Sequence, residues 1–200
     1  MAPEQVLSGT DPAKIAEVCQ KHGITTAEFA QLQARSAEAK ATAYCPYSRF
    51  RVGATLLIPG PAYVDGANVE NASYPVGTCA ERVAFGTAVA QGHREFRAVA
   101  VSTDISPPAS PCGMCRQFIR EFVNLSIPVF MFDKNKDFVV MTMEEVGLAV
   151  FFYISALAPC YNVLLELHLL GISLTDPSQL LPMSFGPDRL PPPGAPGAMG

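Results

Sequence analysis

The sequence predicts one α/β domain, a three-layer α/β/α sandwich around a mixed five-stranded sheet. Strand-like runs alternate with segments of helical periodicity, which is the pattern of such sandwiches. Of the 200 residues, 49% are hydrophobic and only 16% are charged, so the chain can bury a core. The formal net charge of −4 offers no basic surface, and we therefore expect a small-molecule partner and no nucleic acid.

The N-terminal part predicts two helices. Asp11-Pro12 pairs an N-cap residue with a proline suited to the first helical turn, and Gly23 ends this short helix. Thr25-Thr26-Ala27-Glu28 is a capping box that predicts a second helix, which continues to about Ala43.

The remaining elements follow from alternation and turn signals. Gly60-Pro61 separates two strand-like runs and predicts a hairpin. From there we expect strands at 50–59, 63–69, 98–102, 128–132 and 138–141, with helices at 78–91 and 112–122.

We expect the six cysteines to serve metal binding or redox chemistry and not disulfide bonds. The chain starts Met-Ala-Pro-Glu-Gln, without a basic segment followed by an apolar one, so we expect a cytoplasmic protein. In a reducing compartment a Cys-x-x-Cys pair indicates metal binding or redox chemistry.

Three cysteines and one glutamate form the most informative pattern. Cys79 stands two residues before Glu81, and Cys112 and Cys115 form a Cys-x-x-Cys pair after Pro111. Three thiolates suit zinc and leave its fourth position open for water, which is the arrangement of a catalytic site. Glu81 is near enough to act as general base on that water, and the pattern matches the zinc nucleobase-deaminase signature.

Two alternatives compete with this interpretation. Cys112 and Cys115 alone are compatible with a structural zinc clip or a redox pair, and Glu81 alone with a solvated glutamate at a helix start. The histidines lie outside the motifs, so no fourth ligand is obvious, and a redox pair needs neither Cys79 nor Glu81. The open catalytic site is therefore favoured.

We expect helix starts at both cysteine motifs. Thr78 is a candidate N-cap, and a helix dipole lowers the pKa of thiols at its N-terminus. Arg82 and Arg116 directly follow the motifs and can donate to sulfur or balance its charge. The alternative for either arginine is a surface salt bridge.

Four blocks of sequence stand out in a fixed order along the chain. They are Tyr44-Cys45-Pro46-Tyr47-Ser48-Arg49-Phe50-Arg51-Val52-Gly53-Ala54, Asn68-Val69-Glu70-Asn71-Ala72-Ser73-Tyr74-Pro75, Thr78-Cys79-Ala80-Glu81-Arg82 and Pro111-Cys112-Gly113-Met114-Cys115-Arg116-Gln117. Together they closely resemble the small homotetrameric zinc-dependent cytidine deaminases. The resemblance runs from about Thr26 to Glu145 and resumes at Leu181.

The resemblance implies one Zn²⁺ per subunit, a homotetramer, and hydrolysis of cytidine and deoxycytidine to uridine and deoxyuridine in pyrimidine salvage. It implies that Asn68 and Glu70 bind the sugar, that Phe50 forms an aromatic wall against the base, and that the amide of Ala80 binds the pyrimidine carbonyl. It also implies substrate contacts for Tyr74 and, from a neighbouring subunit, Phe185.

One segment departs from the family pattern. We divide the chain into an N-terminal extension at 1–24, a catalytic domain at 25–145, an anomalous apolar insertion at 146–179, the end of the catalytic domain at 180–190 and a Pro/Gly tail at 191–200. Residues 146–165 carry no charge and are long enough to span a membrane, but their flanks are acidic and Pro159 interrupts them.

A genuine insertion and a buried core helix are further explanations of this segment. A translated intron fits more details, because deleting 146–179 restores an unbroken family-like sequence and the end codons are compatible with splice signals.

The alternatives for the activity are a deaminase of the blasticidin S type and a non-catalytic protein that is zinc-stabilised or membrane-associated. The intact Glu81 argues against lost catalysis.

Overall fold

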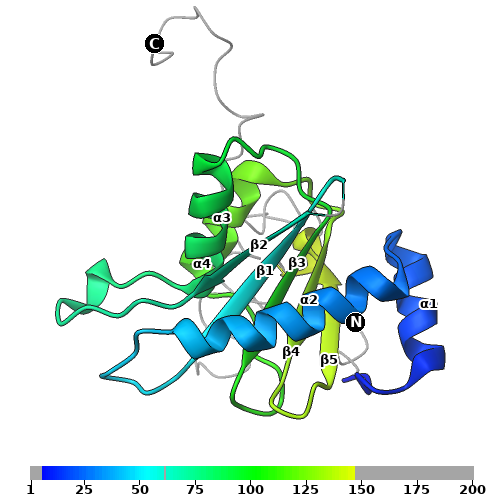
Figure 1. Cartoon of the computed structure of the whole chain (residues 1–200), viewed down its shortest axis with the longest axis horizontal. Helices are drawn as coiled ribbons and strands as arrows, with labels where there is room; N and C mark the ends of the chain where they lie inside the picture. The colour runs from blue at the N-terminus through cyan, green and yellow to red at the C-terminus, as the bar shows by residue number, and fades with distance from the viewer. Residues whose placement is uncertain (1–5, 61, 147–200) are drawn as a thin grey trace, which may run out of the picture.

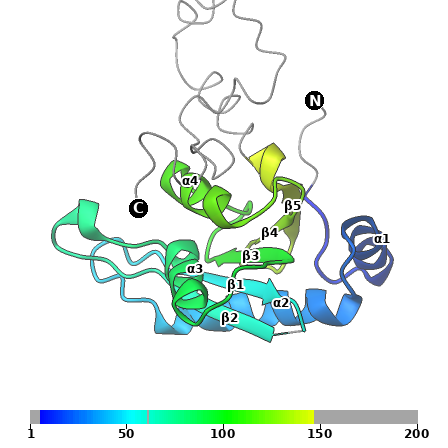
Figure 2. The ribbon, with the colours of Figure 1, turned by 90° about the horizontal axis from the view of Figure 1, so that it is seen from above.

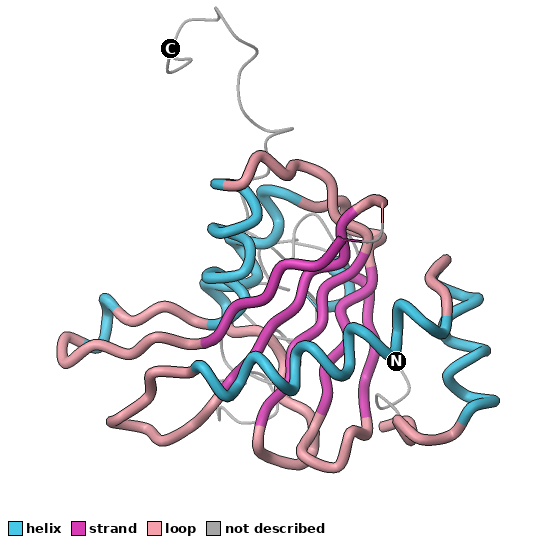
Figure 3. The backbone as a smooth tube through the Cα atoms, viewed as in Figure 1, coloured by secondary structure: helices cyan, strands magenta, loops and turns pink. Residues whose placement is uncertain are grey.

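The structure, a computed structural model, describes residues 6–60 and 62–146, and Figures 1 and 3 show its elements. The expected insertion at 146–179, apart from Val146, and the segments after it lie outside the described residues. The elements are α1 (Pro12–His22), α2 (Thr26–Ala39), the 3-10 turn η1 (Lys40–Thr42), β1 (Val52–Ile58), β2 (Ala62–Ala67), the 3-10 turn η2 (Tyr74–Val76), α3 (Ala80–Ala90), β3 (Ala98–Thr103), α4 (Gly113–Phe122), β4 (Pro128–Phe132) and β5 (Phe138–Thr142).

The five strands form one mixed sheet in the order β2-β1-β3-β4-β5. β3 and β4 are parallel and α4 connects them, while the other neighbours are antiparallel. A parallel pair requires such a crossover, whereas β1 and β2 are joined by the short turn expected at Gly60. The predicted mixed five-stranded sheet is confirmed.

Helices cover both faces of the sheet, as Figure 2 shows from above. α2 lies on one face, where Phe29 and Leu32 pack with Phe130, Phe132 and other buried side chains. α3 and α4 lie on the other face, over a second cluster built from alternate residues of the same strands. The predicted three-layer α/β/α sandwich is therefore confirmed.

The predicted helix starts at the N-terminus are also confirmed. Asp11 accepts hydrogen bonds from the amides of Ala13 and Lys14 at the start of α1, and Gly23 ends that helix with a φ of 66°. Thr25 and Glu28 form the capping box of α2. The helical segment ends earlier than expected, because after Ala39 the chain tightens into η1.

Two glycines allow helices to lie directly against the sheet. A Cβ at Gly53 would lie 2.1 Å from the carbonyl oxygen of Ser36 in α2. A Cβ at Gly66 would lie 2.4 Å from the amide nitrogen of Ala84 in α3. The backbones of α2 and α3 are thus held in contact with β1 and β2, which fixes the position of the α3 N-terminus.

Within the part of the chain that the structure describes, none of the helices combines the length and apolar character needed to cross a membrane.

Candidate metal centre and active site

Three cysteine side chains meet at the N-termini of α3 and α4. Cys79 is the N-cap residue of α3, Cys112 is the N-cap residue of α4, and Cys115 lies in the first turn of α4. Their sulfur atoms lie within 4.8 Å of one another, and those of Cys79 and Cys112 are 3.9 Å apart. Among residues 6–60 and 62–146 this is the one group of three or more candidate ligands that could hold a metal ion.

Thr78 does not cap α3, contrary to the expectation from sequence. The N-cap residue is Cys79, because Thr78 pairs with Val69 in an isolated bridge. The Thr78 amide donates to the Val69 carbonyl over 2.8 Å, and the Val69 amide donates to the Thr78 carbonyl over 2.9 Å. This pairing joins the first cysteine motif to the segment that carries Asn68 and Glu70.

The three thiols share negative charge unequally. Hydrogen bonds from Cys115 and Cys79 lower the pKa of Cys112 to about 2. The hydrogen bonds with Cys112 raise the pKa of Cys79 and of Cys115, and burial raises both further. The expected lowering of thiol pKa at both helix starts holds for Cys112 alone, because closely packed sulfurs disfavour further charge on their neighbours.

Glu81 lies in the first turn of α3, beside the sulfurs. Its side chain is buried, with 4% of the residue exposed, and burial raises the pKa of its carboxyl group. The negative charge of Cys112 acts in the same direction, while a hydrogen bond with Cys115 acts against it. A buried acid next to three thiols is suited to moving protons at a metal centre.

Arg82 lies against the same sulfurs. Although burial acts in the opposite direction, hydrogen bonds to Cys79 and Cys115 and their charges raise the pKa of Arg82. One guanidinium nitrogen, Nη2, also donates to the carbonyl of Gly77 over 3.0 Å. These contacts place Arg82 beside the sulfurs, and its role of balancing thiolate charge stays a prediction.

Arg116 is buried and holds the loop that leads into Cys112. Its Nε donates to the Pro111 carbonyl over 2.6 Å, and its Nη2 donates to the Ser110 hydroxyl over 2.9 Å. Its Nη1 donates to the Val146 carbonyl over 2.5 Å. The role of Arg116 as a donor to sulfur stays a prediction, whereas these contacts show it supporting the position of Cys112.

Asn68 and Glu70 both engage the segment before β1. The Asn68 side chain accepts a hydrogen bond from the Val52 amide over 2.8 Å and donates to the Phe50 carbonyl over 2.9 Å. Glu70 accepts from the amides of Tyr47 and Ser48 over 2.9 and 3.2 Å, and from the Ser48 hydroxyl. The Ser48 hydroxyl bond is the main cause that lowers the pKa of Glu70.

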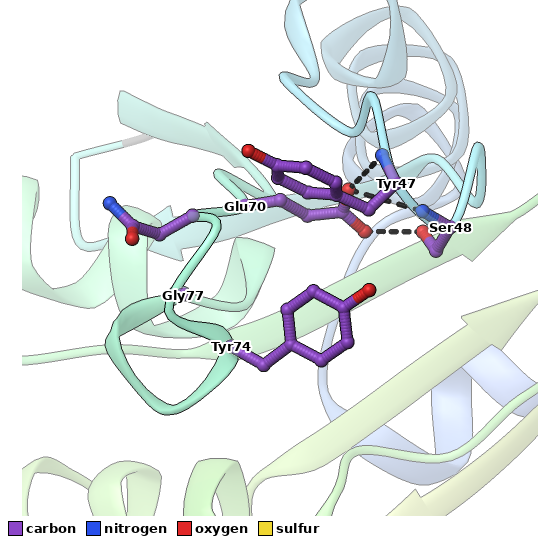
Figure 4. A pocket seen from close by; sticks show the side chains of 6 residues that line it. Tyr47, Ser48, Glu70, Tyr74 and Gly77 are labelled. Atoms are coloured by element: carbon purple, nitrogen blue, oxygen red, sulfur yellow. Dashed lines mark hydrogen bonds between the residues drawn. The ribbon is translucent and has the colours of Figure 1, made fainter.

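A cavity of about 270 Å³ lies beside Glu70 (Figure 4). The rings of Tyr47 and Tyr74 face it with their centroids 5.8 Å apart. Its lining residues are Tyr47, Ser48, Glu70, Asn71, Tyr74 and Gly77. Gly77 both lines this cavity and accepts a hydrogen bond from Arg82, so it connects the cavity to the residues around the cysteine cluster.

The structure brings together most of the residues predicted for the site. Cys79, Cys112, Cys115, Glu81 and Arg82 form one cluster, with the fully buried Ala80 at the start of α3. The residues predicted to bind substrate, Phe50, Asn68, Glu70 and Tyr74, gather on the adjoining loops. Phe185 lies outside the described residues.

Sequence reasoning missed Ser48 and Tyr47, although both stand in the first block of the resemblance. Ser48 accepts a hydrogen bond from the Phe50 amide over 3.0 Å while donating to Glu70, so it connects two predicted substrate residues. A serine directly after Pro46-Tyr47 is a turn signal with a side chain able to bond nearby backbone, and it could have drawn attention to this contact.

Three thiols and a buried carboxyl group on an α/β/α sandwich define the class of zinc-dependent nucleobase and nucleoside deaminases. The soft donor set fits zinc and leaves room for one further ligand. Residues 27–131 match the family model described as the cytidine and deoxycytidylate deaminase zinc-binding region. The chain therefore belongs to this family of zinc-dependent deaminases.

Similar proteins agree with this assignment. A cytidine deaminase of Sporosarcina psychrophila is 45% identical over 58% of this chain and 85% of its own length. A cytidine deaminase of Halalkalibacterium halodurans is 42% identical over 54% of this chain and 82% of its own length. The crystal structure of cytidine deaminase from Burkholderia pseudomallei is 38% identical, with a TM-score of 0.57 over 58% of this chain and 94% of that one. The crystal structure of cytidine deaminase from Mycobacterium leprae is 30% identical, with a TM-score of 0.51 over 59% of this chain and 95% of that one.

Proposed function

We propose that the protein hydrolyses cytidine and deoxycytidine to uridine and deoxyuridine, with release of ammonia. The observation that carries this proposal is the cluster of three sulfurs within 4.8 Å of one another beside the buried Glu81. The family membership supports the reaction type, and the relatives named cytidine deaminase support the substrate.

In this proposal Cys79, Cys112 and Cys115 hold one Zn²⁺, whose Lewis acidity lowers the pKa of a water molecule. Glu81 takes a proton from the attacking water and delivers it to N3 of cytosine, which makes C4 more electrophilic. The oxygen of the water adds to C4. Glu81 then passes the remaining proton of that oxygen to the amino group, which leaves as ammonia while the C4 carbonyl forms.

The adjoining loops orient the nucleoside in this proposal. Asn68 and Glu70 bind the ribose hydroxyls, Phe50 packs against the base, and the Ala80 amide at the start of α3 donates to the pyrimidine carbonyl. Tyr74 contributes from the wall of the cavity. Binding energy from the sugar positions C4 for attack, so weaker sugar contacts lower the rate as well as the affinity.

The decisive experiment compares the full-length, zinc-loaded wild type with Glu81→Gln, which removes the acid and keeps the side-chain shape. We expect ammonia release from cytidine and deoxycytidine by the wild type. We expect a loss of at least about 10²-fold in kcat for Glu81→Gln with one zinc ion retained per chain. Blasticidin S serves as a competing substrate. If the protein turns it over in preference to cytidine, the alternative of a blasticidin S deaminase is favoured.

Arg94→Gln is the matched control, because Arg94 is exposed and donates hydrogen bonds to the nearby carbonyls of Val89 and His93. We expect it to keep wild-type turnover. Substantial turnover by Glu81→Gln would refute the role of Glu81.

Further parts of the proposal concern assembly and location. Exposed side chains near the cavity support a homotetramer, since Tyr47, Tyr74 and Val76 are 47%, 74% and 63% exposed. A neighbouring subunit would then supply Phe185 to the site. A centre made of reduced thiols supports a cytoplasmic location and a role in pyrimidine salvage.

A further inference from the structure

One carboxylate ties together three segments of the chain at the end of the sheet. Asp104 directly follows β3 and accepts hydrogen bonds from Lys40 Nζ over 3.0 Å and from Arg51 Nε over 2.8 Å. Lys40 Nζ also donates to the carbonyl of Thr103 over 3.2 Å. Lys40 begins η1 after α2, and Arg51 directly precedes β1, so Asp104 joins the end of α2, the start of β1 and the end of β3.

Strand register explains why Arg51 and Asp104 meet. Val52 pairs with Thr103 in the antiparallel β1–β3 ladder, so the next pair along the same register is Arg51 and Asp104. Alternate residues of a strand share a face, and Gly53 lies against α2. Arg51 therefore reaches Asp104 from the α2 face of the sheet, while Val52 packs in the cluster on the opposite face, which contains Ala80 and Cys115.

Asn68 also holds the segment Phe50–Val52, which contains Arg51. Asn68 bonds the carbonyl of Phe50 and the amide of Val52, the two residues that flank Arg51. The Asn68 amide also donates to the Val52 carbonyl over 3.2 Å. The position of the Phe50–Val52 backbone is thus set jointly by Asn68 in the site and by Asp104 behind it.

We propose that Asp104 is a positioning residue for nucleoside binding: it holds Arg51 and Lys40 so that Phe50 and Asn68 lie where the substrate needs them. This inference rests on the proposed function. The Arg51–Asp104 pair contributes little to global stability, because its side chains are 53% and 34% exposed, whereas the Lys40 side chain is 13% exposed. Loss of the Arg51 contact therefore acts on geometry and substrate binding more than on folding.

The test compares Asp104→Asn with Asp65→Asn in the full-length, zinc-loaded protein. Asp65 is a matched control, because its side chain is also 34% exposed and accepts hydrogen bonds from Arg35 of α2 and Thr55 of β1. For Asp104→Asn we expect KM for cytidine to rise about 5- to 20-fold and kcat to fall as well, with zinc content within about twofold of wild type. Asp65→Asn should leave KM within about twofold, and Asp104→Glu should recover most of the affinity.

A second readout does not depend on turnover. The Val52 amide donates to the Asn68 side chain, so its hydrogen exchange should become at least about tenfold faster in Asp104→Asn and stay unchanged in Asp65→Asn. Unchanged KM and unchanged Val52 exchange in Asp104→Asn would overturn the inference, as would an equal rise of KM in Asp65→Asn. If the wild type does not turn over cytidine, the proposed function fails, and the exchange comparison still decides the positioning role.

Discussion

Replacing Gly66 by alanine tests whether contact between α3 and the sheet sets the metal centre. A Cβ at Gly66 would lie 2.4 Å from the amide nitrogen of Ala84, 2.6 Å from the carbonyl oxygen of Ala80 and 2.9 Å from the Cα of Ala84. All three atoms belong to the backbone of α3, so no side chain can rotate away. To reach an ordinary contact of 3.4 Å, the helix must retreat by about 1 Å.

A shift of this size matters because α3 begins directly after Cys79, whereas the other two sulfurs belong to the α4 region. Zinc–ligand distances tolerate deviations of only about 0.2 Å. We therefore expect Gly66→Ala to weaken zinc binding by about 10- to 100-fold. Overpacking should also lower the free energy of unfolding by about 1–3 kcal/mol.

The assay is zinc competition against a chromophoric chelator, combined with thermal unfolding of the zinc-loaded and chelated protein. Gly86→Ala is the control, because Gly86 lies in the same helix with nothing within 4 Å of an added Cβ. It should keep zinc affinity and raise the stability by about 0.5–1 kcal/mol. A Gly66→Ala variant with zinc affinity within twofold of wild type would refute the reasoning, and so would an equal loss in Gly86→Ala.

Three further predictions concern substrate binding, pH and the apolar segment. Ser48→Ala should raise KM for cytidine about 3- to 10-fold, because the hydroxyl bond to Glu70 is lost, whereas Ser48→Thr should stay near wild type in steady-state kinetics. Burial lowers the pKa of His22, so its contribution to stability is present above the unfolded pKa of about 6.5 and is lost as pH falls through the lower folded value. Urea unfolding at pH 7.5 and 5.5 should therefore show a smaller pH dependence in His22→Leu than in wild type, and equal dependence would contradict this. Deleting 146–179 should increase the soluble, tetrameric fraction in size-exclusion chromatography, and equal solubility, tetramer content and turnover would count against our interpretation of that segment.

Local sequence signals predicted the elements that depend on neighbours in the chain. The caps at Asp11 and Thr25 are confirmed because an N-cap needs only its own helix. The same reasoning was wrong at Thr78, where the bridge to Val69 takes the residue out of the cap position. That pairing joins segments nine residues apart, and helix-capping rules contain no information about it.

The candidate site shows the same contrast between features set by local sequence and features set by contacts between distant segments. Cys112 and Cys115 were predictable as a pair from their spacing, and Cys79 and Glu81 from the motif they form. The unequal pKa shifts of the thiols could not be predicted from the sequence, because they depend on how closely two helices approach each other in space. The hydrogen-bond partners of Asn68 could not be predicted either, since they are backbone groups of residues far away in the sequence, and backbone groups do not depend on residue type.

The bond from Arg116 to Val146 gives the described domain a fixed exit point. Val146 is fully buried, and its carbonyl is held by the same guanidinium that fixes Pro111 and Ser110 ahead of Cys112. Because Arg116 bonds Val146 and the loop before Cys112 at the same time, a displacement of Val146 would pass through this one side chain to the loop of a metal ligand. The junction therefore couples the end of the described domain mechanically to the cysteine cluster.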